Sequence, residues 1–378
     1  MGPAVAATDP RVIGGASRPL RVMIVDDSAV VRGIFRRTLE AHPEIEIVAS
    51  VSNGQQALDT LVRHPADVVL LDIEMPVMDG MTALPKILAQ NPGVKVIMAS
   101  TLTEKNAAIS LEALRIGAAD YIPKPTARHE IHSADDFKRE LVSKVKALGR
   151  SAARRSPETP FAASKQMAQA RPPAAIELRK PSAVPPRIIA IGSSTGGPQA
   201  LFKLFEGLKG QTADVPIVVV QHMPKAFTGI LAEHLAKIAG TRCGEGRDGE
   251  QLEAGAIYIA PGDFHMIVEK KDRGHVIRLN QEPPENYCRP SVEPLFRTVS
   301  AEFGAAALAL MLTGMGHDGL DASRTLVEAG GTLIAQDEKS SVVWGMPGAV
   351  ATAGLCAQVL PIDEIAPSVS RLLRREKS

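Results

Sequence analysis

The sequence lacks the features of several large protein classes. None of its apolar runs is long enough to cross a membrane, and the segment up to about Pro19 lacks the compact apolar core of a secretory signal. The cysteines, Cys243, Cys288 and Cys356, are odd in number and scattered, which argues against a disulfide framework or a zinc site. These absences favour a cytoplasmic location without membrane insertion.

An excess of charge of one sign is also absent. The 378 residues carry a formal net charge of +1, so no overall attraction to nucleic acid is expected. Hydrophobic residues make up 45% of the chain, which is enough for the cores of two domains. Basic residues gather only between positions 149 and 186, among Ala, Pro and Ser. This composition predicts a flexible linker, with a partner-docking segment as the alternative.

The most informative stretch joins an apolar run to a helix-like segment through a glycine-rich turn. Residues 189–198 read Ile-Ala-Ile-Gly-Ser-Ser-Thr-Gly-Gly-Pro, and they contain the nucleophile-elbow pattern Gly-x-Ser-x-Gly around Ser194. The dinucleotide pattern fails because Ser194 replaces its second glycine, and a Walker loop fails because Pro198 and Gln199 replace its Lys and Ser/Thr. The stretch favours a serine nucleophile, with a phosphate loop or a plain turn as alternatives.

Two later apolar runs end in the groups that a serine nucleophile needs. His222 follows the run 218–221, and Asp318 follows the run 307–312 after a glycine-containing turn. The carboxyl ends of parallel strands meet at one edge of a sheet, where sites assemble. We therefore predict a triad in which Ser194 attacks, His222 accepts its proton and Asp318 orients the ring. Taken singly, the histidine would be structural and the aspartate a helix cap.

The chain order Ser, His, Asp differs from the order in α/β-hydrolases, so a standard hydrolase fold is not expected. Further motifs are Ala-Pro-Gly-Asp at 260–263, Arg-Pro-Ser-Val at 289–292 and Trp-Gly-Met-Pro at 344–347. Together with the triad segments they closely resemble the catalytic domain of the bacterial chemotaxis protein-glutamate methylesterases, the CheB family. The resemblance runs from about residue 187 nearly to the end of the chain.

The resemblance implies a substrate and a second oxyanion donor. The substrate would be the γ-glutamyl methyl ester on the cytoplasmic helices of chemoreceptors, cleaved with release of methanol; deamidation of receptor glutamines is the companion reaction. The elbow makes the main-chain N–H of Thr195 the first oxyanion donor, and the resemblance adds that of Met315. The family commonly has Ala at Ser193 and Asn at His317, so His317 is an alternative base. No cofactor is expected for this reaction.

The first part of the chain carries different chemistry. Asp26 and Asp27 follow one apolar run, and Asp72 follows another. Clustered carboxylate oxygens suit Mg²⁺, a hard cation. Ser100 ends a third run, and Lys124 follows a fourth. This ordered set resembles the receiver domain of response regulators.

That resemblance implies a phosphorylation site. Asp72 would accept a phosphoryl group from the chemotaxis histidine kinase in a step that requires Mg²⁺. The implied metal ligands are three carboxylates and one main-chain carbonyl, those of Asp26, Asp27, Asp72 and Glu74. The residues implied in the switch that follows phosphorylation are Ser100, Tyr121 and Lys124.

These segments predict two doubly wound α/β domains. The first is a flavodoxin-like receiver with a five-stranded parallel sheet, and the second is a methylesterase domain with a mostly parallel sheet and a β-hairpin around residues 272–274. The expected divisions are a flexible tail at 1–19, the receiver at 20–148, the linker at 149–186 and the catalytic domain at 187–376. The expected receiver strands are 21–25, 45–51, 68–71, 95–99 and 120–122.

The sequence thus favours a monomeric, phosphorylation-activated hydrolase. We expect the tethered receiver to lie over or near Ser194 until Asp72 is phosphorylated. The alternative is a receiver-regulated protein that binds a partner without catalysis. A nucleic-acid-binding regulator ranks last, because no basic domain or helix-turn-helix pattern follows the linker.

Overall fold

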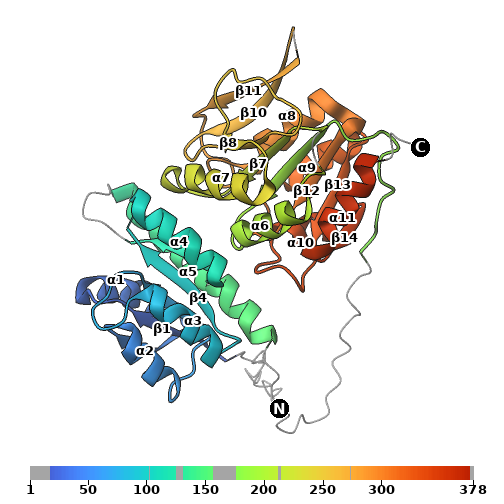
Figure 1. The fold of residues 1–378 in the computed structure, drawn as a ribbon. Helices are drawn as coiled ribbons and strands as arrows, with labels where there is room; N and C mark the ends of the chain where they lie inside the picture. Colours follow the sequence, from blue (N-terminus) through green and yellow to red (C-terminus); the bar gives the residue numbers. More distant parts are fainter. Residues whose placement is uncertain are drawn as a thin grey trace, which may run out of the picture.

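The computed structural model describes residues 18–101, 103–124, 131–155, 176–211, 214–272 and 274–374. They form two α/β domains (Figure 1). The predicted flexible tail falls outside these ranges up to residue 17, as does the middle of the predicted linker, residues 156–175. Among the described helices, none combines the length and the apolar character that a membrane crossing requires.

The N-terminal domain contains one parallel sheet in the strand order β2-β1-β3-β4-β5. This order and direction confirm the predicted receiver fold. The central strand is fully buried, as the continuous run Val-Val-Leu-Leu-Asp requires in a sheet covered on both faces. The strands are β1 (Leu20–Val25), β2 (Ile45–Val51), β3 (Val68–Asp72), β4 (Lys95–Ser100) and β5 (Asp120–Pro123).

Helices cover both faces of this sheet, and short polar side chains cap most of their N-termini. Ser28, Asn53 and Asp79 each accept a hydrogen bond from a main-chain N–H of the first turn that follows. Helix α5 continues beyond residue 148, where the sequence predicted the receiver to end. The helices are α1 (Ala29–Glu40), α2 (Gly54–Leu61), α3 (Gly80–Gln90), α4 (Glu104–Ile116) and α5 (Ile131–Arg155).

The C-terminal domain contains a parallel sheet in the order β14-β13-β12-β6-β7-β9-β8. A separate antiparallel hairpin, β10 and β11, lies where the sequence predicted one. The sheet strands are β6 (Ile188–Ser193), β7 (Ile217–Gln221), β8 (Cys243–Glu245), β9 (Ile257–Ile259), β12 (Ala307–Met311), β13 (Thr332–Gln336) and β14 (Gln358–Leu360). The hairpin strands are β10 (His265–Lys271) and β11 (Gly274–Asn280).

Helices cover both faces of the second sheet. Successive side chains of a strand point to opposite faces, so a strand that is apolar throughout needs a hydrophobic layer on each side. In β6, Ile189 and Ile191 belong to one hydrophobic cluster, whereas Ile188 and Ala190 belong to another. The helices are α6 (Gly197–Gly207), α7 (Lys225–Ala239), α8 (Val292–Phe303), α9 (Leu320–Glu328), α10 (Met346–Thr352) and α11 (Ile362–Leu373).

In both sheets the first strand of the domain lies inside the sheet. The next strand in the chain pairs with one side of it, and a later strand pairs with the other side. Strand β1 lies between β2 and β3, and β6 lies between β7 and β12. The connections after such neighbouring strands diverge and leave a crevice at the carboxyl edge, which is the usual ligand site of open α/β sheets. The fold therefore places Asp26 and Asp72 at one crevice, and Ser194 and Asp318 at the other.

The two domains share an apolar contact. Helix α4 of the receiver packs against α6 and α7 of the catalytic domain (Figure 1). The rings of Tyr121 and Phe227 stack across this contact, with centroids 4.3 Å apart and planes at 13°. The side-chain amide of Gln199 also donates to the main-chain carbonyl of Ala118. One continuous hydrophobic cluster thus runs through both domains.

Candidate functional site

The predicted elbow is a tight turn between β6 and α6. The main-chain N–H of Gly197 donates to the carbonyl of Ser194 at 2.7 Å, and the N–H of Ser194 donates to the carbonyl of Thr313 at 3.0 Å. Gly196 between them has φ of 74°, a conformation that favours glycine. The turn leaves Ser194 partly exposed, although its neighbours on both sides are buried.

The structure brings the other two predicted triad residues together. Nε2 of His222, just after β7, lies 2.8 Å from Oδ2 of Asp318, beyond β12. His222 and Ser194 line one cavity of about 460 Å³, although no hydrogen bond joins their side chains within the described residues. Catalytic hydrogen bonds often form fully only when substrate binds.

The ring of His222 is turned relative to the familiar serine-protease arrangement, in which Nδ1 faces the carboxylate. Nε2 contacts Asp318, so Nδ1 is the nitrogen left for proton transfer. Nδ1 lies 3.5 Å from Sγ of Cys288, which lines the same cavity. A base at this position would act through Nδ1.

Asp318 is buried, and donors from several segments surround its carboxylate. Asn286 Nδ2 and Ser291 Oγ donate to Oδ1 at 2.9 and 2.7 Å, and the N–H of Val292 donates to Oδ2 at 2.7 Å. Val292 begins α8, so the positive end of that helix also faces the charge. Burial raises the pKa of Asp318, but the contacts with His222, Ser291 and the N–H of Val292 outweigh burial and lower it to about 2.

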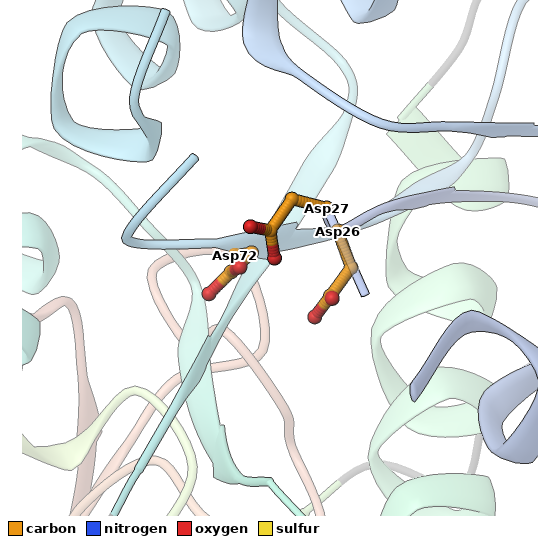
Figure 2. Close-up of side chains that lie close together, drawn as sticks. All are labelled: Asp26, Asp27 and Asp72. Atoms are coloured by element: carbon orange, nitrogen blue, oxygen red, sulfur yellow. The ribbon is translucent and has the colours of Figure 1, made fainter. Parts of the chain in front are cut away.

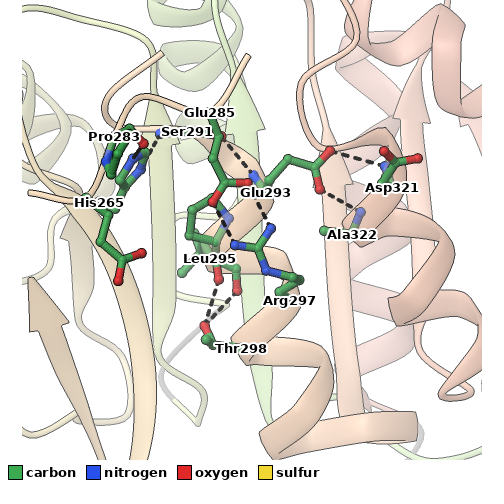
Figure 3. Close-up of polar contacts among 12 residues, drawn as sticks. His265, Pro283, Glu285, Ser291, Glu293, Leu295, Arg297, Thr298, Asp321 and Ala322 are labelled. Atoms are coloured by element: carbon green, nitrogen blue, oxygen red, sulfur yellow. Dashed lines mark hydrogen bonds and ion pairs between the residues drawn. The ribbon is translucent and has the colours of Figure 1, made fainter. Parts of the chain in front are cut away.

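A second layer of polar contacts holds these donors (Figure 3). His265 Nδ1 accepts from the N–H of Ser291 at 3.3 Å, and its Nε2 donates to the carbonyl of Pro283 at 3.2 Å, which gives this histidine a structural role. The carboxylate of Glu293 accepts two main-chain N–H groups from the first turn of α9. Asp318 is not the cap of that helix, because its N-cap is Gly319 and makes no side-chain bond.

The two predicted oxyanion donors also line the cavity. Thr195 and Met315 both contribute to its wall, and no hydrogen bond within the described residues uses the main-chain N–H of either one. Both donors are therefore available to a ligand, and their oxyanion role stays a prediction. His317 is exposed, whereas the neighbouring Asp318 is bonded to His222.

The predicted phosphorylation site is a compact acidic cluster (Figure 2). Carboxylate oxygens of Asp26, Asp27 and Asp72 lie within 4.8 Å of one another. Lys124 Nζ lies 2.8 Å from Asp26 Oδ2 and 2.6 Å from Asp72 Oδ1. The other oxygen of Asp72 is buried and accepts no hydrogen bond within the described residues. These hard oxygen donors fit Mg²⁺.

The remaining predicted switch residues occupy defined positions. Ser100 is buried, and its Oγ accepts a hydrogen bond from Ser110 at 3.1 Å. Tyr121 is held in the stack between the domains. The carboxylate of Glu74 lies 3.5 Å from Lys105, outside the acidic cluster. The main-chain carbonyl of Glu74 remains the predicted ligand.

Receiver side chains complete the wall of the Ser194 cavity, in the position that the sequence predicted for this domain. The guanidinium of Arg139 lies 4.4 Å from the centroid of the Tyr287 ring. Tyr287 and Asn286 both have positive φ, 63° and 51°, a region that asparagine tolerates but that is strained for tyrosine. The receiver residues in the wall are Asp120, Tyr121, Asp136, Arg139, Glu140, Ser143 and Lys144.

Comparison with known proteins assigns a family to each domain. A model described as CheB methylesterase matches residues 189–369, and one described as response regulator receiver domain matches residues 22–135. The protein-glutamate methylesterase/protein-glutamine glutaminase 1 of Paramagnetospirillum magneticum is 54% identical over 95% of this chain and 98% of its own. The chain belongs to the CheB methylesterase family.

Two further matches are a relative of similar length and a solved structure of a single domain. The protein-glutamate methylesterase/protein-glutamine glutaminase of Azospirillum brasilense is 54% identical over 94% of this chain and 93% of its own. Among solved structures, the Thermotoga maritima CheB methylesterase catalytic domain is 37% identical and covers 50% of this chain and 100% of its own, with a TM-score of 0.48.

Sequence reasoning missed the residues that surround the predicted triad. Ser291 could have been found as a polar residue directly before a helix, because it caps α8. Glu293 looks like an ordinary first-turn acid, and its bond to α9 depends on packing between helices. Asn286 reaches Asp318 from a loop whose conformation no local pattern specifies.

The pKa of His222 depends on its two neighbours. Burial lowers it, but Cys288 beside Nδ1 and Asp318 beside Nε2 outweigh burial and raise the pKa to about 10. Only the neutral ring can accept a proton from Ser194, so the raised pKa reduces the fraction of molecules that are ready to react at neutral pH. With an ordinary histidine as base, activity would fall on acidification at about pH 6.5. Because the pKa of His222 is raised, we expect this fall, the acid limb of the pH–rate profile, at higher pH.

Replacing Cys288 by alanine should lower the pKa of His222, because it removes one of the two groups that stabilise the protonated ring. We expect the acid limb of kcat/KM for ester hydrolysis to move down by roughly one pH unit or more. The measurement is a pH–rate profile of the full chain. The control is Cys243→Ala, since this thiol lies on β8 outside the cavity. An unchanged limb in Cys288→Ala would contradict this account.

Burial raises the pKa of Asp72 to about 6, although Lys124 opposes the shift. The folded chain therefore binds this proton more tightly than the unfolded chain, and stability falls as pH rises from about 4 to about 6. Asp72→Asn should raise the free energy of unfolding by on the order of 2–3 kcal/mol at pH 7. The gain should disappear toward pH 4.

Thermal or urea unfolding of the receiver transition at several pH values measures this gain. Asp59→Asn, on the exposed face of α2, is the control for the loss of a carboxylate at the receiver surface. A stabilisation by Asp72→Asn that is the same at pH 4 and pH 7 would mean that another group titrates.

Proposed function

We propose that this protein hydrolyses glutamyl methyl esters of chemoreceptors with release of methanol, and deamidates receptor glutamines, through Ser194, His222 and Asp318. The observation that carries the proposal is the convergence of the His222–Asp318 hydrogen bond and Ser194 on one cavity. Curated relatives that match nearly the whole chain are named for both activities. Both reactions replace a leaving group on the same acyl carbon, so one triad can serve them.

The residues have distinct roles in this reaction. Ser194 Oγ attacks the acyl carbon while Nδ1 of His222 takes its proton, and Asp318 stabilises the resulting imidazolium. His222 then gives the proton to the departing methanol or ammonia, and water hydrolyses the acyl-enzyme. The main-chain N–H groups of Thr195 and Met315 would stabilise the negative oxygen.

Phosphorylation of Asp72 by the chemotaxis histidine kinase would control this reaction in the cytoplasm. Asp26, Asp27, Asp72 and the main-chain carbonyl of Glu74 would hold Mg²⁺, which when bound offsets negative charge on the phosphoryl oxygens. Lys124 already contacts Asp72 and would pair with the phosphoryl group.

The contact between the domains supports a gate. Receiver side chains wall the cavity, and Tyr121 stacks on Phe227 of α7. A linker makes this contact intramolecular, so a weak interface suffices to close it. A phosphoryl group adds about −1.5 to −2 charge next to β3 and β4, and this charge would shift the balance toward the open state through Ser100 and Tyr121.

Ser194→Ala should reduce methanol release from methylated receptor by about 10³-fold or more, because it removes the nucleophile. The control is Ser323→Ala: Ser323 Oγ is buried in α9 and makes no hydrogen bond within the described residues, so activity should persist. Methanol release by Ser194→Ala at the wild-type rate would instead show that Ser194 is not the nucleophile.

Arg139→Ala should open the gate in the unphosphorylated full chain. The guanidinium over the Tyr287 ring contributes about 0.5–1 kcal/mol, so the basal rate should rise about two- to fivefold. Lys138→Ala is the matched control, because Lys138 and Arg139 each pair with an acid three residues earlier but only Arg139 lines the cavity. The rate is measured with and without acetyl phosphate and Mg²⁺.

Full stimulation should bring wild type and Arg139→Ala to similar rates, because both gates are then open. Asp72→Asn should show no stimulation by the phosphodonor. A basal rate of Arg139→Ala equal to that of Lys138→Ala would contradict the gate, whereas stimulated Asp72→Asn would contradict only the phosphorylation site.

A further inference from the structure

A buried hydroxyl–amide pair lies directly beneath the nucleophile and the base. Ser193 ends β6 and Gln221 ends β7, and the two residues are partners in the parallel register. Ser193 Oγ donates to Gln221 Oε1 at 2.7 Å. Both side chains are almost fully buried, and neither lines the cavity. Their immediate successors in the chain are Ser194 and His222.

The amide of Gln221 has one sensible orientation. Its Nε2 faces two main-chain carbonyls, that of Ser194 at 2.9 Å and that of His222 at 3.2 Å. Carbonyl oxygens only accept hydrogen bonds, so the nitrogen must point toward them. The oxygen of the amide then meets the hydroxyl of Ser193, which can donate. The two carbonyls therefore fix the direction of the amide, and the Ser193 hydroxyl holds its oxygen in place.

This amide links the two reacting residues through their backbones. The carbonyl of Ser194 accepts both from Gln221 Nε2 and from the N–H of Gly197, which closes the elbow. The turn is shaped to admit the side chain: a Cβ on Gly197 would lie 1.9 Å from Gln221 Oε1. The bond to the carbonyl of His222 ties the base to the same group.

We propose that Gln221, held at its amide oxygen by Ser193, is a positioning residue that sets the distance between Ser194 and His222. The inference rests on the proposed function, because it assumes that these two residues exchange a proton. Gln221 touches no substrate, so its loss should affect the chemical step and leave substrate binding almost unchanged. Misplacement of a catalytic group by about 1 Å can cost about 100-fold in rate.

The test uses Gln221→Met, which keeps the size of the side chain and removes both amide groups. In the full chain, stimulated with acetyl phosphate and Mg²⁺, we expect kcat to fall about 10- to 100-fold with KM within about twofold. The rate at which a fluorophosphonate labels Ser194, counted per folded molecule, should fall in parallel. Ser193→Ala should give a smaller loss in the same two measurements.

A double-variant cycle tests the assigned order of action. If Ser193 acts through Gln221, the Ser193→Ala/Gln221→Met chain should be no slower than Gln221→Met alone. Losses that multiply would overturn this arrangement. If Gln221→Met does not fold, Ser193→Ala alone decides, because an unchanged kcat in that variant would also overturn the proposal.

Tyr258→Phe is the control for a purely structural effect. Tyr258 is buried on β9, and its hydroxyl makes two hydrogen bonds away from the cavity. It should lower the unfolding midpoint without changing kcat per folded molecule. The same behaviour in Gln221→Met would overturn the proposal. Ser194→Ala separates a failure of the proposed function from a failure of this inference. If Ser194→Ala keeps methanol release, the proposed function fails. If Ser194→Ala is inactive and Gln221→Met is fully active, only this inference fails.

Discussion

The buried carboxylate of Asp318 is the constraint on which the catalytic edge depends. A charge that is 3% exposed is tolerated only where hydrogen bonds replace water. Its donors come from the end of β7, from the loop before α8 and from the N-terminus of α8 itself. His222 lies far in the sequence from the other donors, which are close neighbours of one another. Each one is fixed in place because leaving this carboxylate unpaired would be costly.

The receiver solves a similar problem with a lysine. Asp26 and Asp72 are buried beside one another, and Lys124 contacts both. A second buried lysine, Lys144, supports the domain interface: its Nζ donates to the carbonyl of Tyr121 at 2.7 Å and lies 3.3 Å from Asp120. Tyr121 is thus fixed by its backbone on one side and by Phe227 on the other. Electrostatics within the receiver therefore sets the position of the ring that meets the catalytic domain.

The sequence was sufficient for the elements and for the residues that end them. Apolar runs such as Val68–Asp72 have one interpretation in a parallel sheet, and the polar residue after each run must lie at the carboxyl edge. This reasoning located both the acidic cluster and the His222–Asp318 pair. It could not give the rotation of the His222 ring, because that depends on which nitrogen Asp318 reaches.

Contacts made by loops and buried side chains were equally out of reach. Asn286 meets Asp318 through a backbone conformation that few residues other than glycine adopt, and no residue pattern encodes it. Ser193 stands where the family commonly has alanine, and the sequence alone does not show that its hydroxyl is bonded to Gln221 in the interior. Such pairs join positions 28 residues apart and become visible only when the strands are in register.

The shared cavity has a thermodynamic consequence. Tyr121 and Arg139 form part of its wall, so under the proposed function a protein substrate that reaches Ser194 would compete with the receiver for the same surface. Coupling between two sites is reciprocal: if phosphorylation of Asp72 eases substrate entry by some factor, bound substrate must favour the phosphorylated receiver by the same factor. The receptor would then be an effector of this protein as well as its substrate. Receptor sites that are still methylated would stabilise the phosphorylated receiver, which is the state that promotes their hydrolysis.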